Sequence, residues 1–312
     1  MKFRFKKPAI AMLFFAAAAG AMAQEKQPQK MSAADSMMNA MNAADKSSQP
    51  VVIFKSTRLV LSQTTQTVRA GNLNFQIIHR FGDIAGADGG GQTAFGIDRV
   101  NDVYFGFEYG VTDDLNVDVG RSTIGQLVQI ELKYALMHQT TDGSPFAITL
   151  LGEAGARAYQ GNIYPTFASR TSYLLQAPIA RKFSDWLSLQ VTPTYITNNT
   201  PYPAGSEKSF FALQGAARLG ISRHGGFIID YAHPFSSFRD NNYNFQNPLG
   251  IGYEVETGGH VFTVNVSNAN SISDINYLSN SQQRWSRGQY RVGFTISRMF
   301  DFRKAKDAPK DK

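Results

Sequence analysis

The chain has 312 residues, of which 43% are hydrophobic, 12% aromatic and 18% charged, and its mean hydropathy is −0.26. The apolar content excludes a wholly disordered chain, and the low hydropathy excludes a bundle of membrane helices. The formal net charge of +7 belongs to the two ends: residues 1–23 hold four bases and no acid, and residues 303–312 hold five bases against two acids. The remaining body is neutral, so we expect no nucleic-acid partner.

The first 23 residues have the pattern of a cleaved secretory signal peptide. Bases in residues 1–7 precede an apolar stretch at 8–20, and residues 21–23 supply an A-x-A cleavage site. The apolar stretch is shorter than the roughly 20 residues that a spanning helix needs. The chain contains no cysteine, which excludes a disulfide framework and cysteine-based chemistry. We therefore expect an exported protein.

Two segments follow before any strand pattern begins. Residues 24–50 are polar and rich in Gln, Ser and Ala, which predicts a flexible linker. Residues 51–70 are too polar for a lipid-facing strand, and we expect them to form a lumen plug or a periplasmic cover. Two additional strands are the alternative. The apolar side chains of this segment that favour burial are Val51, Val52, Ile53, Phe54, Leu59, Val60 and Leu61.

Residues 71–302 alternate between apolar and polar side chains. In residues 103–111, Phe105 and Phe107 fall on one face, and Glu108 falls on the other. A period of two is typical of a half-buried β-strand. Turn signals divide this body into twelve predicted strands, at residues 73–81, 103–111, 115–121, 127–138, 147–159, 171–183, 187–197, 210–222, 227–234, 249–257, 260–270 and 289–302.

The connectors between these strands alternate in length, with only 122–126 departing from the alternation. Tight turns on one rim and long loops on the other are typical of bacterial outer-membrane barrels. The short connectors are 112–114, 139–146, 184–186, 223–226 and 258–259, and the long ones are 82–102, 160–170, 198–209, 235–248 and 271–288.

The pattern predicts an all-β fold, a transmembrane antiparallel up-and-down β-barrel of about twelve strands. Fourteen strands are the alternative if residues 51–70 add two. Strands cross lipid only as a closed barrel, because the bilayer core offers no partners for free backbone groups. We expect the barrel to lie in the outer membrane with both termini in the periplasm, because the strand number is even and the long connectors share one rim.

In such a barrel apolar faces contact lipid and polar faces line the lumen. The six bases and seven acids predicted there nearly balance, which indicates cross-lumen ion pairs among residues such as Glu131, Lys133, Glu153 and Arg157, and a narrow or plugged pore. The predicted lumen-facing charges are Arg80, Glu108, Asp118, Glu131, Lys133, Glu153, Arg157, Lys182, Arg218, Asp230, Glu254, Glu256 and Arg291.

The sequence resembles a membrane β-barrel family of Bacteroidota, the domain of unknown function 5777, in three stretches. These are residues 54–68 (FKSTRLVLSQTTQTV), 73–84 (LNFQIIHRFGDI) and 95–122 (FGIDRVNDVYFGFEYGVTDDLNVDVGRS). The resemblance covers most of residues 51–302. It implies a porin-like barrel of a Gram-negative outer membrane, and it brings no substrate, cofactor or catalytic residue.

The sequence contains no G-x-S-x-G, Walker or H-E-x-x-H motif. The acids of the Gly-rich loop 82–102 lack the spacing of an EF-hand, which favours a flexible loop over a calcium site. His224 and His260 lie in or beside predicted turns, where solvated side chains are a better interpretation than a metal site at the rim. We therefore predict no catalytic residues, no metal, no cofactor and no enzymatic activity.

Two functions remain compatible with these features. The first is an outer-membrane channel or transporter for small solutes, narrow or plugged. The alternative is a non-conducting structural or interaction barrel whose long extracellular loops bind a partner. The partners that we expect are outer-membrane lipid, the barrel-insertion machinery and a surface or periplasmic protein.

Overall fold

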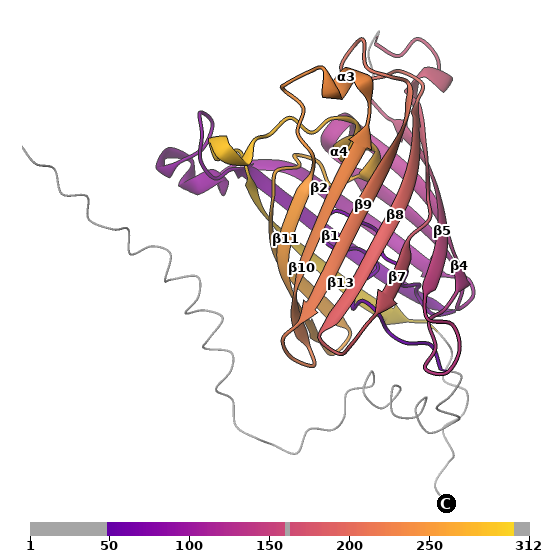
Figure 1. The fold of residues 1–312 in the computed structure, drawn as a ribbon. Coiled ribbons are helices and arrows are strands. Elements are labelled where there is room, and N and C mark those ends of the chain that lie inside the picture. Colours follow the sequence, from indigo (N-terminus) through magenta and orange to yellow (C-terminus); the bar gives the residue numbers. More distant parts are fainter. Residues whose placement is uncertain (1–48, 160–162, 303–312) are drawn as a thin grey trace, which may run out of the picture.

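The computed structural model describes residues 49–159 and 163–302, which form a closed antiparallel β-barrel (Figure 1). The predicted signal peptide, nearly all of the predicted linker 24–50 and the basic tail 303–312 lie outside the described residues. β1 pairs with both β2 and β13, so the first and last strands join and the ring is closed.

Thirteen strands make up the wall in the described part of the chain, and apart from β6 and β7, strands that follow each other in the chain are neighbours in the ring. They are β1 (Asn72–Asp83), β2 (Val100–Gly110), β3 (Leu115–Ser122), β4 (Leu127–Met137), β5 (Ala147–Arg157), β6 (Thr171–Gln176), β7 (Ile179–Lys182), β8 (Leu187–Asn198), β9 (Ser209–Gly220), β10 (Gly225–Phe235), β11 (Leu249–Thr257), β12 (His260–Ser267) and β13 (Arg291–Asp301).

β6 and β7 are two parts of one strand position, because both pair with β5 and with β8. The break falls at Ala177 and Pro178, where proline has no N–H to donate to the ladder. The ring therefore has twelve strand positions, as predicted. The fourteen-strand alternative is wrong, since the described part of residues 51–70 adds only isolated bridges to the sheet.

The connectors contain only short helices. These are η3 (Gly91–Gly96), η4 (Ile124–Gln126), η5 (Ala168–Arg170), α3 (Ser237–Asp240), α4 (Asp274–Ser279) and η6 (Trp285–Arg287). Among the described residues, no helix has the length and apolar character needed to cross a membrane. Asn72 pairs with Asp301, so both ends of the barrel lie at one rim, the rim of the short turns.

The alternation within each strand separates an exposed apolar face from a buried polar one. In β2, Phe105 and Phe107 are 41% and 48% exposed, whereas Glu108 is 3% exposed. In β4, Ile130 is 54% exposed and Glu131 is buried. A soluble protein buries such apolar side chains. The outer surface therefore has the apolar character that a lipid-facing barrel requires.

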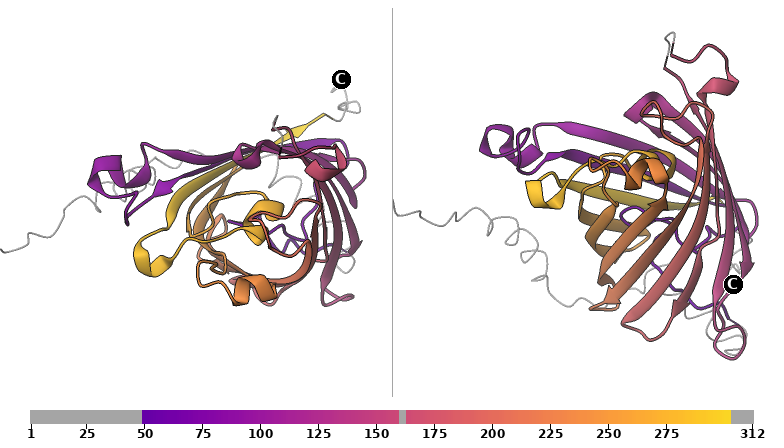
Figure 2. Two further views of the ribbon diagram at one scale, coloured as in Figure 1. Left: turned by 90° about the horizontal axis from the view of Figure 1, so that it is seen from above. Right: turned by 45° about the horizontal axis from the view of Figure 1, so that its top comes forward.

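Two segments outside the wall fill the barrel interior. Figure 2 shows the wall as a ring, seen from above, with an indigo and a yellow segment inside it. The first is residues 51–65, the inner plug, in which Phe54 and Val60 are each 1% exposed. The second is residues 268–283, the inner loop, in which α4 is almost wholly buried. The predicted external loop 271–288 therefore folds inward over its first part.

The interior has an apolar core of its own, which corrects the prediction of a polar lumen. Apolar residues of the inner plug and of α4 pack against inward positions of β4 to β10. The reason is that the two inner segments bring apolar side chains that need a dry neighbour. The wall contributes Leu127, Ala147, Leu151, Leu174, Ala180, Ile196, Phe210, Ala212, Ala216, Ile228 and Ala232.

Candidate functional site

The inner plug turns back on itself inside the barrel. Leu59 N donates to Ser62 O at 2.9 Å, and Thr64 N donates to Thr57 O at 2.9 Å. This small hairpin directs the apolar residues at its turn into the core. It also leaves several backbone groups of the plug facing the wall, where they need partners.

Side chains from six strands of the wall form hydrogen bonds with the plug, and four of these bonds involve its backbone groups. Because the six strands lie on different sides of a closed ring, a segment that contacts all of them must lie inside it. The hydrogen bonds are Gln76 Nε2 to Thr57 Oγ1 (2.7 Å), Lys133 Nζ to Thr57 O (3.3 Å), Thr149 Oγ1 to Thr65 O (3.0 Å), Ser188 Oγ to Ile53 O (2.8 Å), Ser62 Oγ to Gln214 Oε1 (3.2 Å) and Leu61 N to Asp230 Oδ2 (2.8 Å).

A glycine makes room for the turn of the plug. A Cβ on Gly250 of β11 would come within 2.6 Å of Val60 Cγ1 and 2.5 Å of Asp230 Oδ1. Real Cβ atoms do not approach other heavy atoms so closely. The wall and the plug are therefore fitted to each other at this position.

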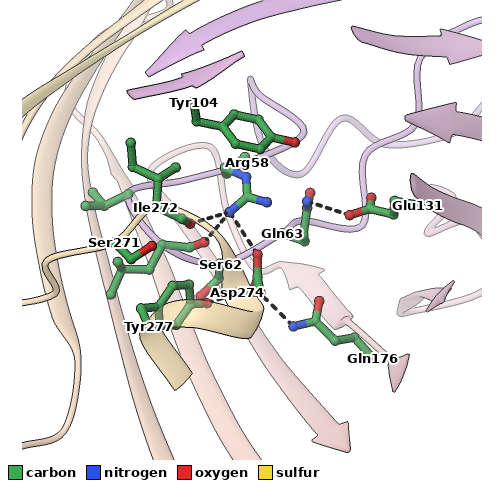
Figure 3. Close-up of polar contacts among 12 residues, drawn as sticks. Arg58, Ser62, Gln63, Tyr104, Glu131, Gln176, Ser271, Ile272, Asp274 and Tyr277 are labelled. Carbon is green, nitrogen blue, oxygen red and sulfur yellow. Dashed lines mark hydrogen bonds and ion pairs between the residues drawn. The ribbon is translucent and has the colours of Figure 1, made fainter. Parts of the chain in front are cut away.

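Arg58 joins the inner plug to the inner loop (Figure 3). Its Nη1 lies 2.9 Å from Asp274 Oδ2 and donates to the carbonyls of Leu61, at 3.0 Å, and Ile272, at 3.2 Å. The guanidinium carbon is 5.6 Å from the centre of the Tyr104 ring, a cation–π contact. Burial lowers the pKa of Arg58, but Asp274 and other nearby groups raise that pKa above its ordinary value.

The carboxylate of Asp274 is in turn held by the wall. Its Oδ1 accepts a hydrogen bond from Gln176 Nε2 of β6 at 3.1 Å, and the hydroxyl of Tyr277 lies 2.8 Å away. The same hydroxyl is 2.9 Å from Gln214 Oε1 of β9. Burial, followed by the charge of Asp274, raises the pKa of Tyr277 well above its ordinary value. The phenol is therefore neutral and acts as a donor.

Asp102 attaches the residues of the inner loop that precede Asp274. Its carboxylate accepts from Ile272 N at 2.9 Å and from Ser271 Oγ at 3.1 Å. On the neighbouring strand, Arg80 Nη1 donates to Ser271 O at 2.9 Å and its Nη2 to Val60 O at 3.2 Å. Both charged side chains are fully buried. Inner loop, inner plug and wall thus share one polar network.

Four carboxylates form a row across adjacent strands of the wall. Glu108 of β2 is opposite Asp118 of β3, Asp118 is opposite Glu131 of β4, and Glu131 is opposite Glu153 of β5. All four are buried. Like charges opposite one another on neighbouring strands destabilise a sheet. We call these four residues the acidic row.

The sequence profile of a known family matches residues 54–300, described as the membrane bound beta barrel domain (DUF5777). The chain belongs to this family. The family assignment agrees with the resemblance found in the sequence, and it identifies the closed barrel as a membrane-bound domain. A comparison with curated proteins finds no match for this DUF5777 barrel.

Several solved structures have a similar strand arrangement. The NanC porin is 10% identical, covers 74% of this chain and 100% of its own, and has a TM-score of 0.46. The KdgM porin in complex with disordered oligogalacturonate is 7% identical and covers 74% and 99%, with a TM-score of 0.44. An outer membrane channel from Pseudomonas putida F1 is 10% identical and covers 76% and 98%, with a TM-score of 0.46. These similarities concern the barrel fold alone.

Most of the thirteen charged residues predicted in the lumen are buried in the DUF5777 barrel. Ten are buried: Arg80, Glu108, Asp118, Glu131, Lys133, Glu153, Arg218, Asp230, Glu254 and Arg291. The other three, Arg157, Lys182 and Glu256, are partly exposed. Lys182 pairs with Asp185 at 2.9 Å, and Glu256 pairs with Lys55 at 2.7 Å.

The specific ion pairs predicted across the lumen are wrong. Lys133 lies 3.7 Å from Glu108, and Glu131 accepts a hydrogen bond from Gln63 at 2.9 Å. Both oxygens of Glu153 lack a hydrogen-bond partner among the described residues. The prediction failed because the strand register places Glu131 opposite Glu153, an acid, and because the plug supplies a partner of its own.

Sequence reasoning missed four buried charged residues of the barrel interior. Asp83 and Asp102 were assigned to the loop 82–102, but Asp83 ends β1 and Asp102 lies in the first part of β2. Arg58 and Asp274 lie outside the strands, where alternation gives no signal. One usable signal was Arg58 itself, because an arginine beside Leu59, Val60 and Leu61 needs an acid if that apolar run is buried. Among the described residues, no group of three or more His, Asp or Glu side chains is placed to hold a metal ion.

Proposed function

We propose that this DUF5777 barrel is an outer-membrane channel for small solutes, closed in the present conformation by the inner plug and the inner loop. The observation that carries the proposal is the set of hydrogen bonds between plug and wall, which lie beside their apolar contacts. Asp230 accepts from two backbone N–H groups of the plug, Leu61 N at 2.8 Å and Ser62 N at 3.2 Å. Water can replace such bonds when a plug withdraws, whereas a purely apolar contact has no comparable substitute.

The charges inside the barrel also favour a channel. A barrel that serves only as a scaffold gains nothing from buried charges, because apolar residues of similar volume are often as stabilising or more so. Here Arg80 and Asp102 are fully buried and Glu131 is nearly so. Such charges are expected in a lumen that fills with water when the plug withdraws, because the water then solvates them.

The proposed orientation follows from the two rims. Both ends of the barrel lie at the rim of the short turns, and short turns are periplasmic in outer-membrane barrels. We therefore infer that both termini lie on the periplasmic side. We also propose export through residues 1–23 and no catalytic role. Apolar residues, some of them aromatic, alternate with polar or small residues in the last strand, β13. This pattern supports insertion through the barrel-insertion machinery.

Conductance in planar bilayers tests the channel. Arg58→Gln leaves Asp274 without its cation, and removing one partner of a buried ion pair costs roughly 3–5 kcal/mol. A loss of about 3 kcal/mol in the docking free energy of the plug raises the fraction of open barrels by about a hundredfold, as long as most plugs remain docked. We expect Arg58→Gln to conduct far more than the unaltered chain. Lys55→Gln, at the partly exposed pair with Glu256, is the matched control and should conduct like the unaltered chain.

A second function is favoured by the long-loop rim. Phe167 and Tyr243 are 74% and 76% exposed there, and large exposed aromatics are enriched at protein-binding surfaces. A non-conducting barrel that binds a partner through its long loops would retain them. Absence of conductance in both the unaltered chain and Arg58→Gln would favour this function over the channel.

A further inference from the structure

The wall of the barrel interior has an excess of acids. Among the described wall strands, eight acids and four bases are buried. The acids are Asp83, Asp102, Glu108, Asp118, Glu131, Glu153, Asp230 and Glu254, and the bases are Arg80, Lys133, Arg218 and Arg291. The prediction from sequence, which placed six bases against seven acids, underestimated this excess.

Three of the four bases are each used by one acid. Arg218 lies 2.5 Å from Glu254, Arg291 lies 2.7 Å from Asp83, and Lys133 lies 3.7 Å from Glu108. The fourth base, Arg80, donates to backbone carbonyls of the two inner segments. Five wall acids therefore have no ion pair with a wall base in the described part of the chain: Asp102, Asp118, Glu131, Glu153 and Asp230.

The inner segments supply hydrogen-bond donors to three of these five acids. Asp230 accepts from the backbone of the plug, Glu131 accepts from Gln63 of the plug, and Asp102 accepts from the backbone of the inner loop as well as from the neighbouring Ser122. Asp118 accepts from Tyr104 of the wall. Glu153, which is 4% exposed, has no hydrogen-bond partner for either oxygen among the described residues. The plug thus occupies a surface whose chemistry is that of a cation site.

We propose that the lumen left by withdrawal of the inner plug selects cations, and that Arg58 is the cation that occupies this path in the closed state. The inference rests on the proposed channel function. The acidic row on β2 to β5 forms one side of the path. Asp230 on β10 belongs to another part of the wall. Rings and rows of carboxylates attract cations and exclude anions from a pore. The solutes that fit are inorganic cations and organic amines.

The surroundings of Arg58 identify the best organic cation. Outside the plug itself, the carbonyl of Ile272 accepts from its Nη1, the carboxylate of Asp274 pairs with it, and the ring of Tyr104 lies against the guanidinium group (Figure 3). A planar guanidinium is suited to such a combination of carboxylate, carbonyl and aromatic face. A solute that carries this group is therefore the strongest competitor of the plug.

The reversal potential in a potassium chloride gradient tests the selectivity. With Arg58→Gln as the conducting form, we expect potassium to permeate at least about tenfold more readily than chloride. Adding Glu131→Gln and Glu153→Gln, which keep the shape of both side chains, should lower that ratio severalfold. Asp142→Asn, at an exposed position in the turn between β4 and β5, is the matched control and should leave the ratio unchanged.

The outcomes separate the inference from the function on which it rests. Conductance with a ratio near one, or with a preference for chloride, overturns the cation path and leaves the channel intact. Absence of conductance overturns both. Because Arg58→Gln leaves Asp274 unpaired, which can impair folding, the measurement is repeated in Gly250→Ala, in which the added Cβ would meet Val60 of the plug and every buried charge is kept.

Discussion

Arg58 Nη1 lies 2.9 Å from Asp274 Oδ2, and the two side chains are 2% and 0% exposed. The pair connects a segment that precedes the first strand with a loop that precedes the last one. A buried ion pair is costly to desolvate, so its value lies in fixing one arrangement of the groups around it. Here that arrangement is the closed lumen.

Single and double substitutions at this pair should give a large coupling energy. Arg58→Met and Asp274→Asn each leave one buried charge unpaired, and each should lower the free energy of unfolding by roughly 3–5 kcal/mol. The double variant should recover most of that loss. Urea unfolding of the barrel in liposomes measures the cycle. Losses that simply add in the double variant would show that the two charges do not act on each other.

Gly250→Ala should destabilise the docked plug. The added Cβ would meet Val60 and Asp230 at distances below normal contact, and overpacking of this kind costs typically about 1–3 kcal/mol. We expect a lower free energy of unfolding and a higher conductance. Gly215→Ala on β9, where a Cβ meets nothing within 4 Å, is the matched control. If both variants behave like the unaltered chain, the plug does not occupy the position described.

Substitutions along β2 should report the depth of the lipid face. Phe107→Arg places a charge on the exposed face within the strand and should cost roughly 2–4 kcal/mol near the bilayer midplane. Val111→Arg, beside the turn that follows β2, should cost about 0–1 kcal/mol because it lies near the interface. The two native side chains are equally exposed, at 48%. Equal costs in liposome unfolding would be incompatible with a membrane-spanning β2.

Trypsin added to intact cells should cut only at the long-loop rim. Arg99 and Arg287 are exposed at that rim, and Arg223 is exposed in a short turn at the opposite rim. In the proposed orientation the first two bonds are cleaved and the third is spared until the outer membrane is opened. Mass spectrometry of the fragments identifies the sites. Cleavage after Arg223 alone in intact cells would invert the orientation.

The strands could be predicted from the sequence because lipid and interior impose opposite chemistry on alternate residues. The predicted strand 249–257 coincides with β11, and the other predicted boundaries lie within a few residues of those observed. The break between β6 and β7 was missed, although Pro178 was a readable signal for it.

The contents of the lumen were harder to predict. The partner of Arg58 lies in a distant loop, and no local periodicity connects the two residues. Doublets such as Leu150-Leu151 and Ile228-Ile229 interrupt the alternation, and in each the inward residue is buried against the inner segments while the other is exposed. Such doublets indicate an apolar interior, but they do not identify the segment that fills it. The choice between a plug and a cover for residues 51–70 therefore needed three-dimensional information.

Reversible cross-linking of the plug to the wall tests the central claim most directly. Ser62 Oγ is 3.2 Å from Gln214 Oε1, and the chain has no cysteine of its own. In the double variant Ser62→Cys/Gln214→Cys, carrying Arg58→Gln to favour opening, a short thiol cross-linker that a reductant cleaves should hold the plug in the lumen. The account predicts no conductance while the cross-link is intact and full conductance of the same molecules after reduction. Equal conductance before and after reduction would contradict it.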